Sequence, residues 1–193
     1  LGYPSFVKPA NLGSSVGISK AKDRKDLSAA LDLAASFDRK VIVEEFIAGR
    51  ELEIGILGNE KGDLRTSVVG EIIPAGEFYD YAAKYKNIGT RLEIPAKVGQ
   101  DVVRRMEALA KQAYLALECA GLARVDFFWD EESDRLYINE INTLPGFTPF
   151  SMYPLLFKEA GVSYQELIET LIKLGLEAYE ERQKNKVTAE RIS

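Results

Sequence analysis

The chain contains no histidine and only one cysteine, Cys119, in 193 residues. A single cysteine cannot form a disulfide within the chain, and the lack of histidine rules out the usual zinc sites built from cysteine and histidine. The fold must therefore be held by a hydrophobic core. With 46% apolar residues, the chain can bury on the order of 70% of its unfolded surface, as one large domain or two small ones.

The same composition limits the chemistry that the chain can perform. Without histidine there is no Ser-His-Asp triad and no histidine general base. With 25 Lys and Arg against 30 Asp and Glu, the formal charge is −5, which argues against a nucleic-acid partner. Catalysis must therefore use carboxylates, lysine, arginine, tyrosine, serine, backbone amides or a hard metal ion.

The sequence carries neither a membrane span nor a secretion signal. Its longest uncharged apolar stretches are far shorter than the roughly 20 residues that cross a bilayer. The first residues lack the basic segment and the apolar core of a signal peptide, and one cysteine favours a reducing compartment. We expect a cytoplasmic protein with no membrane partner, and the abrupt start without Met favours a piece of a longer chain.

Hydrophobic periodicity predicts an α+β fold of two units. In the first, residues 1–47, a helix capped by Asp23 lies between β-rich segments. Its strands are expected at residues 3–8, 18–21 and 41–46, with a loop at 9–17. Ala48 and Gly49 interrupt the last strand, so we place the boundary between the units there.

The second unit, residues 48–176, is predicted to contain a sheet. Alternation over residues 51–56 indicates a strand with one buried face. The other expected elements are strands at 64–73, 122–129 and 136–142, a loop at 76–95, and helices at 99–120, 153–159 and from 162 onward. The last helix is expected to carry Leu167, Ile168, Leu171 and Ile172 on one face. From residue 177 we expect solvated helix that frays into a charged tail at 177–193.

Lys8 precedes a loop rich in glycine and serine, GSSVG at residues 13–17. The backbone amides of such a loop can surround phosphate oxygens, and a lysine at the end of a strand can neutralise their charge. The segment is not a Walker A loop, because no Gly-Lys-Ser/Thr follows it. A plain turn between two strands is the alternative.

The hairpin at residues 122–142 carries the pattern of a metal site. Glu140 and Asn142 are two residues apart on one strand, so their side chains share a face. If Asp126 lies opposite Glu140, the oxygens converge beside Arg124, and such oxygen ligands suit Mg²⁺ or Mn²⁺. The alternative is a strand pair with one solvated face.

Three further segments are candidates for a site, each with an ordinary structural alternative. A Pro-Gly turn within residues 143–151 could present amides and Ser151 to a small anion, or lead into a helix. The aromatic segment 78–85, which includes a lysine, could be a lid that excludes water, or a packed surface loop. The residues at the boundary between the units could hold adenine and ribose, and the alternative is a strand end with solvated acids. They are Glu44, Phe46, Ile47 and Glu51.

Taken together and in order, four segments resemble the D-alanine:D-alanine ligases of the ATP-grasp superfamily. The similarity runs from residue 3 to about residue 174. The segments are VKPANLGSSVGI at 7–18, FYDYAAKY at 78–85, LARVDFF at 122–128 and NEINTLPGFTPFSMYP at 139–154. The resemblance implies the ATP-grasp fold, in which two α+β subdomains clamp a nucleotide between mainly antiparallel sheets.

The resemblance also implies a reaction and its cofactors. ATP would phosphorylate the carboxylate of one D-alanine, and the amine of a second D-alanine would attack the acylphosphate, releasing phosphate. Two Mg²⁺ or Mn²⁺ ions would bridge the phosphates of ATP. The dipeptide would enter peptidoglycan synthesis, and the full-length enzyme would be a homodimer.

By matching position, the resemblance assigns a role to each site residue. The nucleotide would contact Lys8, Ser14, Ser15, Glu44, Phe46, Ile47, Glu51 and Lys84. The metal ions would bind Asp126, Glu140 and Asn142. Catalysis would use Arg124, Ser14, Tyr85 and the amide of Gly146, and the second substrate would contact Ser151 and Met152.

The chain departs from the family in one respect. These ligases have a further N-terminal domain that contributes a glutamate near the first substrate and a second lysine for phosphate. Because the chain starts after both, we expect it to bind magnesium nucleotide weakly and to be a poor ligase alone. The alternatives are a D-alanine:D-serine or D-alanine:D-lactate ligase, and a non-catalytic nucleotide-binding module.

Overall fold

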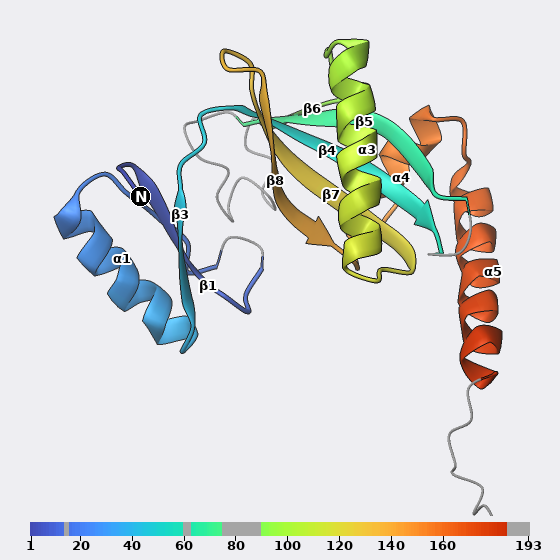
Figure 1. Ribbon diagram of the computed structural model, residues 1–193, viewed down its shortest axis with the longest axis horizontal. Helices are drawn as coiled ribbons and strands as arrows, with labels where there is room; N and C mark the ends of the chain where they lie inside the picture. Colours follow the sequence, from blue (N-terminus) through green and yellow to red (C-terminus); the bar gives the residue numbers. More distant parts are fainter. Residues whose placement is uncertain (14–15, 60–62, 75–89, 185–193) are drawn as a thin grey trace, which may run out of the picture. The chain divides into compact units, whose positions relative to one another are not determined.

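The computed structural model describes residues 1–13, 16–59, 63–74 and 90–184, and it divides into two compact units (Figure 1). The first unit comprises Leu1–Gly49 with Ile73–Arg91, and the second comprises Arg50–Ile72 with Leu92–Ser193. The segment after Ile73, which the sequence assigned to the second unit, thus groups with the first. Most of that segment lies outside the described residues.

The first unit is a small antiparallel sheet with one helix on it. The N-cap is Asp23, as predicted, and its side chain accepts a hydrogen bond from the amide of Asp26. The strands lie in the order β2-β1-β3. The elements are β1 (Ser5–Pro9), β2 (Ser19–Ala21), α1 (Arg24–Phe37) and β3 (Val41–Glu45).

Helix α1 covers only one face of this sheet. Val7 of β1 packs with Ala30 and Ala34 of α1, and all three side chains are buried. Because successive residues of a strand point to opposite faces, Phe6 and Lys8 lie on the face that α1 leaves uncovered. That face carries Lys8, one of the candidate nucleotide residues.

The second unit is built on a five-stranded antiparallel sheet in the order β6-β5-β4-β7-β8. Its strands are β4 (Arg50–Gly58), β5 (Arg65–Ile73), β6 (Arg91–Glu93), β7 (Gly121–Asp130) and β8 (Arg135–Asn142). Its helices are α3 (Gln100–Ala116), α4 (Met152–Glu159) and α5 (Tyr164–Gln183). None of the helices in the described part of the chain is long and apolar enough to span a membrane.

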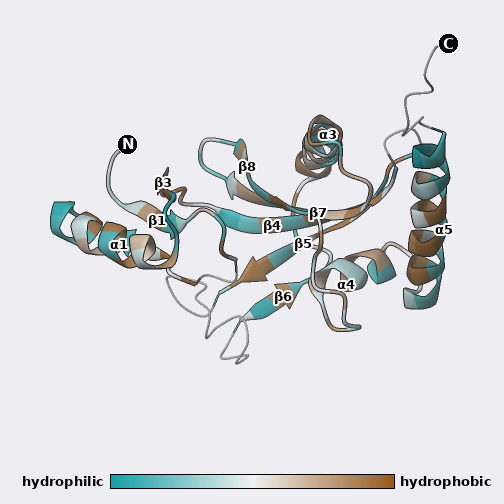
Figure 2. Ribbon diagram, turned by 90° about the horizontal axis from the view of Figure 1, so that it is seen from below, coloured by the Kyte–Doolittle hydropathy of each residue, from teal (hydrophilic) through white to brown (hydrophobic). Residues whose placement is uncertain are grey.

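Helices α3 and α4 pack on opposite sides of this sheet (Figure 2). Under α3, the core joins Ile54 and Val125 of the sheet to Met106 and Ala110 of the helix. A second cluster, which includes Tyr153 and Phe157 of α4 and Leu167 of α5, fills the other side. The central strands are therefore covered on both faces.

Two glycines let α4 approach the sheet closely. A Cβ atom added at Gly55 of β4 would lie 2.7 Å from Phe157, and one added at Gly70 of β5 would lie 2.6 Å from Leu156. The main-chain amide of Gly55 donates to Ser67 Oγ at 2.8 Å, next to an irregularity in the β4–β5 pairing. A side chain at either glycine would push the helix off the sheet.

Several predicted boundaries and faces are wrong in detail. The strand at 51–56 is not half-buried, because Glu53 is only 4% exposed and β4 is central in the sheet. Strand β6 lies inside the segment predicted to be loop. The helix predicted at 99–120 ends at Ala116, and Glu118 follows with a φ of 51°, which a helix cannot continue.

The C-terminal helix continues into the charged segment, as predicted. Helix α5 ends at Gln183, so the charged segment from residue 177 begins as helix. Leu167 is fully buried, whereas Ile168 is 38% exposed and Ile172 is 59% exposed. The apolar face of this helix is therefore only partly buried. The tail beyond residue 184 lies outside the described residues.

Candidate active site

In the first unit, Lys8 and Glu44 form an ion pair on the uncovered face of the sheet. Lys8 Nζ lies 2.7 Å from Glu44 Oε1. The antiparallel pairing of β1 and β3 sets Phe6 opposite Glu44 and Lys8 opposite Ile42, which brings both charged side chains to one face. Here the lysine can bind an anion, and the neighbouring glutamate can accept a hydrogen bond from a hydroxyl group.

Two aromatic rings lie on the same face. The centroids of Phe6 and Phe46 are 5.9 Å apart, and Lys20 Nζ lies 3.9 Å from the centroid of the Phe46 ring. The sequence did not single out Lys20, although pairing of β2 with β1 sets it directly opposite Phe6. The half-buried Ile47 follows directly after Phe46. The face therefore combines flat apolar surface with a second cation.

The predicted phosphate loop is tied down at its ends. Asn11 donates to Asp38 Oδ2 from its main-chain amide at 2.8 Å and from its side chain at 2.7 Å. Hydrogen bonds from the amide of Lys40 and from Asn11 lower the pKa of Asp38. At the other end, Gly17 has a φ of 73° and lies against Phe37, so glycine suits this turn.

Four predicted site residues lie outside the described residues. They are Ser14, Ser15, Lys84 and Tyr85, together with most of the expected lid at 76–95. Glu51, predicted to lie near Glu44, belongs to the second unit, where it is half-buried on β4 opposite Ile72.

In the second unit, strand register brings the predicted metal residues together. Asp126 of β7 lies opposite Glu140 of β8, which is the condition that the predicted metal site required, and Arg124 lies opposite Asn142. The register then shifts by one residue, which leaves Asn139 as a bulge beside Glu140. All four side chains lie on the side of the sheet opposite to α3, since Val125 between them faces that helix.

Arg124 is the centre of this group. Its Nε and Nη2 atoms donate to the two carboxylate oxygens of Asp126, each at 2.7 Å, and Nε also lies 3.1 Å from Glu53 Oε2. Burial alone would lower the pKa of Arg124, but the hydrogen bonds of Asp126 and the charges of Glu53, Asp126 and Glu140 raise it. The guanidinium therefore stays charged.

Glu53 is the residue that sequence reasoning missed here. It lies opposite Asp126 on the neighbouring central strand, and its side chain is only 5% exposed. Alternation assigned it to a solvated face. Local sequence carried no signal for it, because an acid on a strand needs a buried cation only when that strand is covered on both faces.

The donor chemistry of this group fits a hard divalent cation. No cluster of three acidic metal ligands exists within the described residues, and the predicted set uses the amide oxygen of Asn142 with two carboxylates. The charges of Glu53, Asp126 and Glu140 exceed that of Arg124, which leaves a surplus of negative charge at a partly buried site. Oxygen ligands with surplus negative charge favour Mg²⁺ or Mn²⁺.

Gly146 and Ser151 also lie together, in the turn before α4. A Cβ atom added at Gly146 would lie 3.1 Å from Ser151 Oγ. This hydroxyl accepts from the amide of Thr148 at 3.0 Å and contacts Thr148 Oγ1 at 2.9 Å, so it does not cap the amides of α4. The first-turn amides of Met152 and Tyr153 thus remain uncapped by Ser151 and suit an anion.

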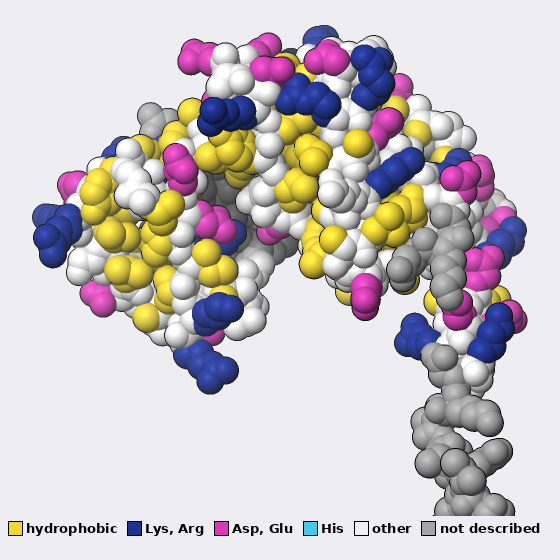
Figure 3. All heavy atoms as spheres, in the orientation of Figure 1, with side chains coloured by type: hydrophobic (Ala, Val, Ile, Leu, Met, Phe, Trp, Pro, Cys, Tyr) yellow, Lys and Arg dark blue, Asp and Glu magenta, His cyan; other side chains and the backbone are white. Residues whose placement is uncertain are grey.

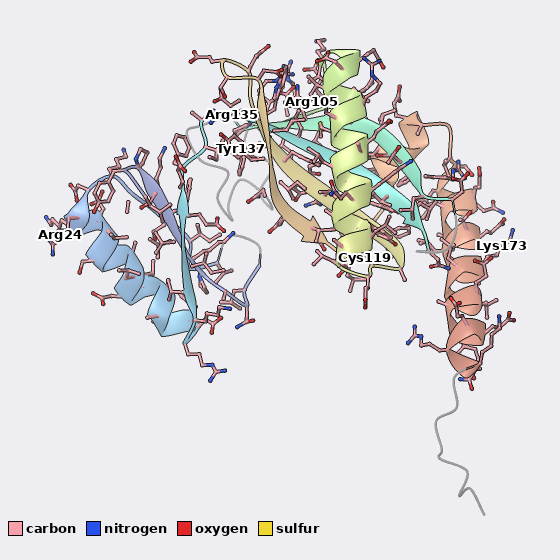
Figure 4. The ribbon with its side chains drawn as sticks, viewed as in Figure 1. Arg24, Arg105, Cys119, Arg135, Tyr137 and Lys173 are labelled. Carbon is pink, nitrogen blue, oxygen red and sulfur yellow. The ribbon has the colours of Figure 1, made fainter. Side chains whose placement is uncertain are left out.

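The far end of the β7–β8 hairpin is a structural contact rather than a site. Arg105 of α3 donates to both carboxylate oxygens of Asp134 at 2.9 Å. Arg105 and Arg135 lie at the same end of the sheet (Figure 4), where acidic and basic side chains are intermingled on the surface (Figure 3). These charges tie the turn to α3.

Comparison with known proteins finds one family over most of the chain. The family described as "D-ala D-ala ligase C-terminus" matches residues 1–173. The D-alanine--D-alanine ligase of Bacillus cytotoxicus is 56% identical over 188 residues, which are 97% of this chain and 51% of that protein. The enzyme of the same name from Acetivibrio thermocellus is 54% identical, over 94% of this chain and 48% of that protein.

Two solved structures share the fold. The D-alanine-D-alanine ligase from Coxiella burnetii superposes with a TM-score of 0.82 at 33% identity, over 94% of this chain and 47% of that one. The VanG D-Ala:D-Ser ligase from Enterococcus faecalis superposes with a TM-score of 0.81 at 39% identity, over 90% of this chain and 50% of that one. The chain thus spans about half the length of the curated relatives it matches.

Proposed function

The chain belongs to the D-alanine:D-alanine ligase family, and from that premise we propose that it is the ATP-binding part of a ligase that joins two D-alanines. Its α+β architecture is the ATP-grasp fold of these enzymes. The observation that carries the proposal is the strand register that faces Asp126 with Glu140 and Arg124 with Asn142. That arrangement supplies a cation site and a fixed positive charge in one place.

The first unit would bind the nucleotide on the face that α1 leaves uncovered. Lys8 would pair with phosphate oxygens. Its ion pair with Glu44 holds the ammonium group in a fixed position on this face. The adenine and ribose would contact Glu44, Phe46 and Ile47 of this unit, and the family resemblance adds Glu51 of β4. Ser14, Ser15 and Lys84 would complete the phosphate contacts.

The divalent cations, two Mg²⁺ or Mn²⁺ ions, would be held by Asp126, Glu140 and Asn142. When bound, they would neutralise the phosphates of ATP and so favour transfer of the terminal phosphoryl group. This need is physical, because ATP carries more negative charge than Lys8, Lys84 and Arg124 can offset.

The reaction would then proceed in two steps. A carboxylate oxygen of the first D-alanine takes the terminal phosphoryl group of ATP, and ADP leaves. The amine of the second D-alanine attacks the acyl carbon, the peptide bond forms, and phosphate departs with the bonding electrons. Arg124 and the amide of Gly146 would stabilise the negative oxygen that develops at that carbon, with Ser14 and Tyr85 near the first substrate.

Ser151 and the amide of Met152 would bind the carboxylate of the second D-alanine. The uncapped start of α4 favours an anion there, because the aligned peptide dipoles place positive charge at a helix N-terminus. Thr148 fixes the Ser151 hydroxyl next to Gly146. Acceptor binding and oxyanion stabilisation would thus share one turn.

The second candidate is a ligase that takes D-serine as the acceptor. It is favoured by the similarity to the VanG D-Ala:D-Ser ligase, at 39% identity. The residues proposed to hold the acceptor carboxylate would be the same in both reactions. We further propose a cytoplasmic setting, where ATP and amino acid substrates are available, and, from the family resemblance alone, a homodimeric full-length enzyme.

Nucleotide binding tests the proposal. The chain spans about half of its relatives, so the test measures binding rather than turnover. Calorimetric titration with a non-hydrolysable ATP analogue gives the affinity with and without Mg²⁺. We expect Asn142→Ala to weaken the magnesium-dependent binding by about tenfold, the value of one lost charge-assisted contact. Glu132→Gln, in the solvated hairpin turn, is the matched control and leaves binding unchanged. Binding that ignores both Mg²⁺ and Asn142→Ala would refute the proposed metal site.

A further inference from the structure

Arg124 is held by two carboxylates from two different strands. Its Nε–H is donated to Asp126 Oδ1 at 2.7 Å, while Glu53 Oε2 lies 3.1 Å from the same nitrogen. The contact with Glu53 is an ion pair, because the Nε hydrogen is donated to Asp126. Glu53 therefore lies within hydrogen-bonding distance of the nitrogen whose hydrogen Asp126 accepts.

The carboxylates of Asp126 and Glu53 differ in their proposed roles at the cation site. Asp126 is a proposed ligand of the cation, and a cation on its oxygens competes with the two hydrogen bonds of Arg124. Glu53 has a side chain only 5% exposed, on the central strand β4, and is not in the proposed ligand set. Its position is fixed by main-chain pairing with β7, opposite Asp126.

We propose that Glu53 is a positioning residue that holds Arg124 in place while Asp126 binds the cation. With Asp126 engaged by a cation, Glu53 would accept the Nε–H and so keep the guanidinium near the developing oxyanion. This inference rests on the proposed function for its purpose, but the hold of Glu53 on Arg124 is a property of the chain alone.

A simpler view is that Glu53 only adds negative charge near the cation. The two views differ in what a shorter acid does. Glu53→Asp keeps the charge but is one methylene shorter, so it cannot reach Nε across the sheet. A charge effect survives this change, whereas a positioning effect is lost.

The test follows the Arg124 Nε–H directly by NMR of the intact chain. Its signal in a ¹H–¹⁵N spectrum is assigned by its disappearance in Arg124→Lys. We compare the rate of hydrogen exchange in the wild type, in Asp126→Ala, and in the double variant Glu53→Asp with Asp126→Ala. Removing Asp126 stands in for its engagement by a cation, without any ligand being present.

We expect Asp126→Ala to keep the Nε–H protected, because Glu53 accepts it. The double variant should exchange about tenfold faster or more, as for the loss of a hydrogen bond to a charged group. Equal protection in the double variant and in Asp126→Ala would overturn the proposal, and so would loss of protection in Asp126→Ala alone. If the double variant does not fold, Glu53→Met with Asp126→Ala, which keeps the volume without an oxygen, replaces it.

A second arm separates this inference from the proposed function. With saturating Mg²⁺ and ATP analogue, the wild type should keep the Nε–H protected, while the single variant Glu53→Asp should lose protection by about tenfold. Unchanged protection in Glu53→Asp under a ligand that binds would count against the handover. If the wild type binds no magnesium nucleotide, the proposed function fails, and the Asp126→Ala comparison still decides the role of Glu53.

Discussion

Lys8 and Glu44 form an ion pair of 2.7 Å across neighbouring strands, on the sheet face opposite to α1. Glu44 is 39% exposed, so the pair contributes less than about 1 kcal/mol to folding. If Lys8 contacts phosphate, Lys8→Ala should weaken nucleotide binding by roughly tenfold to a hundredfold, as for a lost charge-assisted hydrogen bond. Calorimetry measures the affinity, and urea denaturation measures the stability.

Lys25→Ala is the matched control for that prediction. Lys25 is an exposed lysine on α1, the helix that covers the other face of the same sheet. It changes the net charge of the unit equally, so it should leave nucleotide affinity within about twofold of the wild type. Equal losses in Lys8→Ala and Lys25→Ala would mean that net charge, not position, sets the affinity.

Arg50 is a clamp at the start of β4. It donates to the carboxylate of Glu71 at 2.8 and 2.6 Å and to the carbonyl of Lys97 at 3.1 Å, and it lies 5.3 Å from the ring centroid of Trp129. Its pKa is raised, chiefly by the hydrogen bonds to Glu71. Arg50→Ala should lower the free energy of unfolding by about 2–3 kcal/mol, because Glu71 is left buried without its cation.

A double-mutant cycle with Glu71→Gln checks the cause. Glu71 is 7% exposed, so the cost of Arg50→Ala arises mainly from its stranded charge. Removing that charge should restore part of the loss, and the double variant should be more stable than Arg50→Ala alone. A double variant that is less stable than either single variant would show that packing of the arginine side chain dominates.

Local pattern was enough to predict the hairpin. A strand repeats every two residues, and a charged turn lies between two apolar runs. The facing of Asp126 and Glu140 was only a condition of the predicted metal site, because regular pairing from the turn would set Asp126 opposite Asn139 and the bulge shifts the register. The cap at Asp23 was predictable for the same reason, since a cap depends on residues within one turn. These features depend on neighbours in sequence.

The burial of Glu53 and the approach of α4 could not be predicted in this way. Both depend on which strand is central and which helix crosses it, and segments far apart in sequence decide that. The bulge at Asn139 is a further case, because it places Ile138 and Ile141, three residues apart, opposite Phe127 and Val125 of one face. Alternation alone would have put them on opposite faces.

Asp38 should make the first unit sensitive to acid. Its pKa is lowered, first by the amide of Lys40 and further by Asn11, so folding favours the ionised form. A lowered pKa adds stability that is present above the unfolded value of about 3.9 and is lost as pH falls through the folded value. The difference in unfolding free energy between wild type and Asp38→Asn should therefore be constant at neutral pH and shrink below about pH 4. A difference that grows on acidification would contradict this assignment, and urea denaturation across pH measures it.

Two glycines in the second unit should respond to alanine in opposite directions. At Gly55, a Cβ atom would lie 2.7 Å from Phe157 and 3.1 Å from Tyr153, and the hydroxyl of Tyr153 is fixed by a 2.9 Å bond to the carbonyl of Ile56. Gly55→Ala should therefore lower the free energy of unfolding by about 1–3 kcal/mol through overpacking. Gly175 lies inside α5 with open space around it, so Gly175→Ala should raise stability by about 0.5–1 kcal/mol. Chemical denaturation of both variants gives the signs, and a stable Gly55→Ala would mean that α4 does not pack against β4 as described.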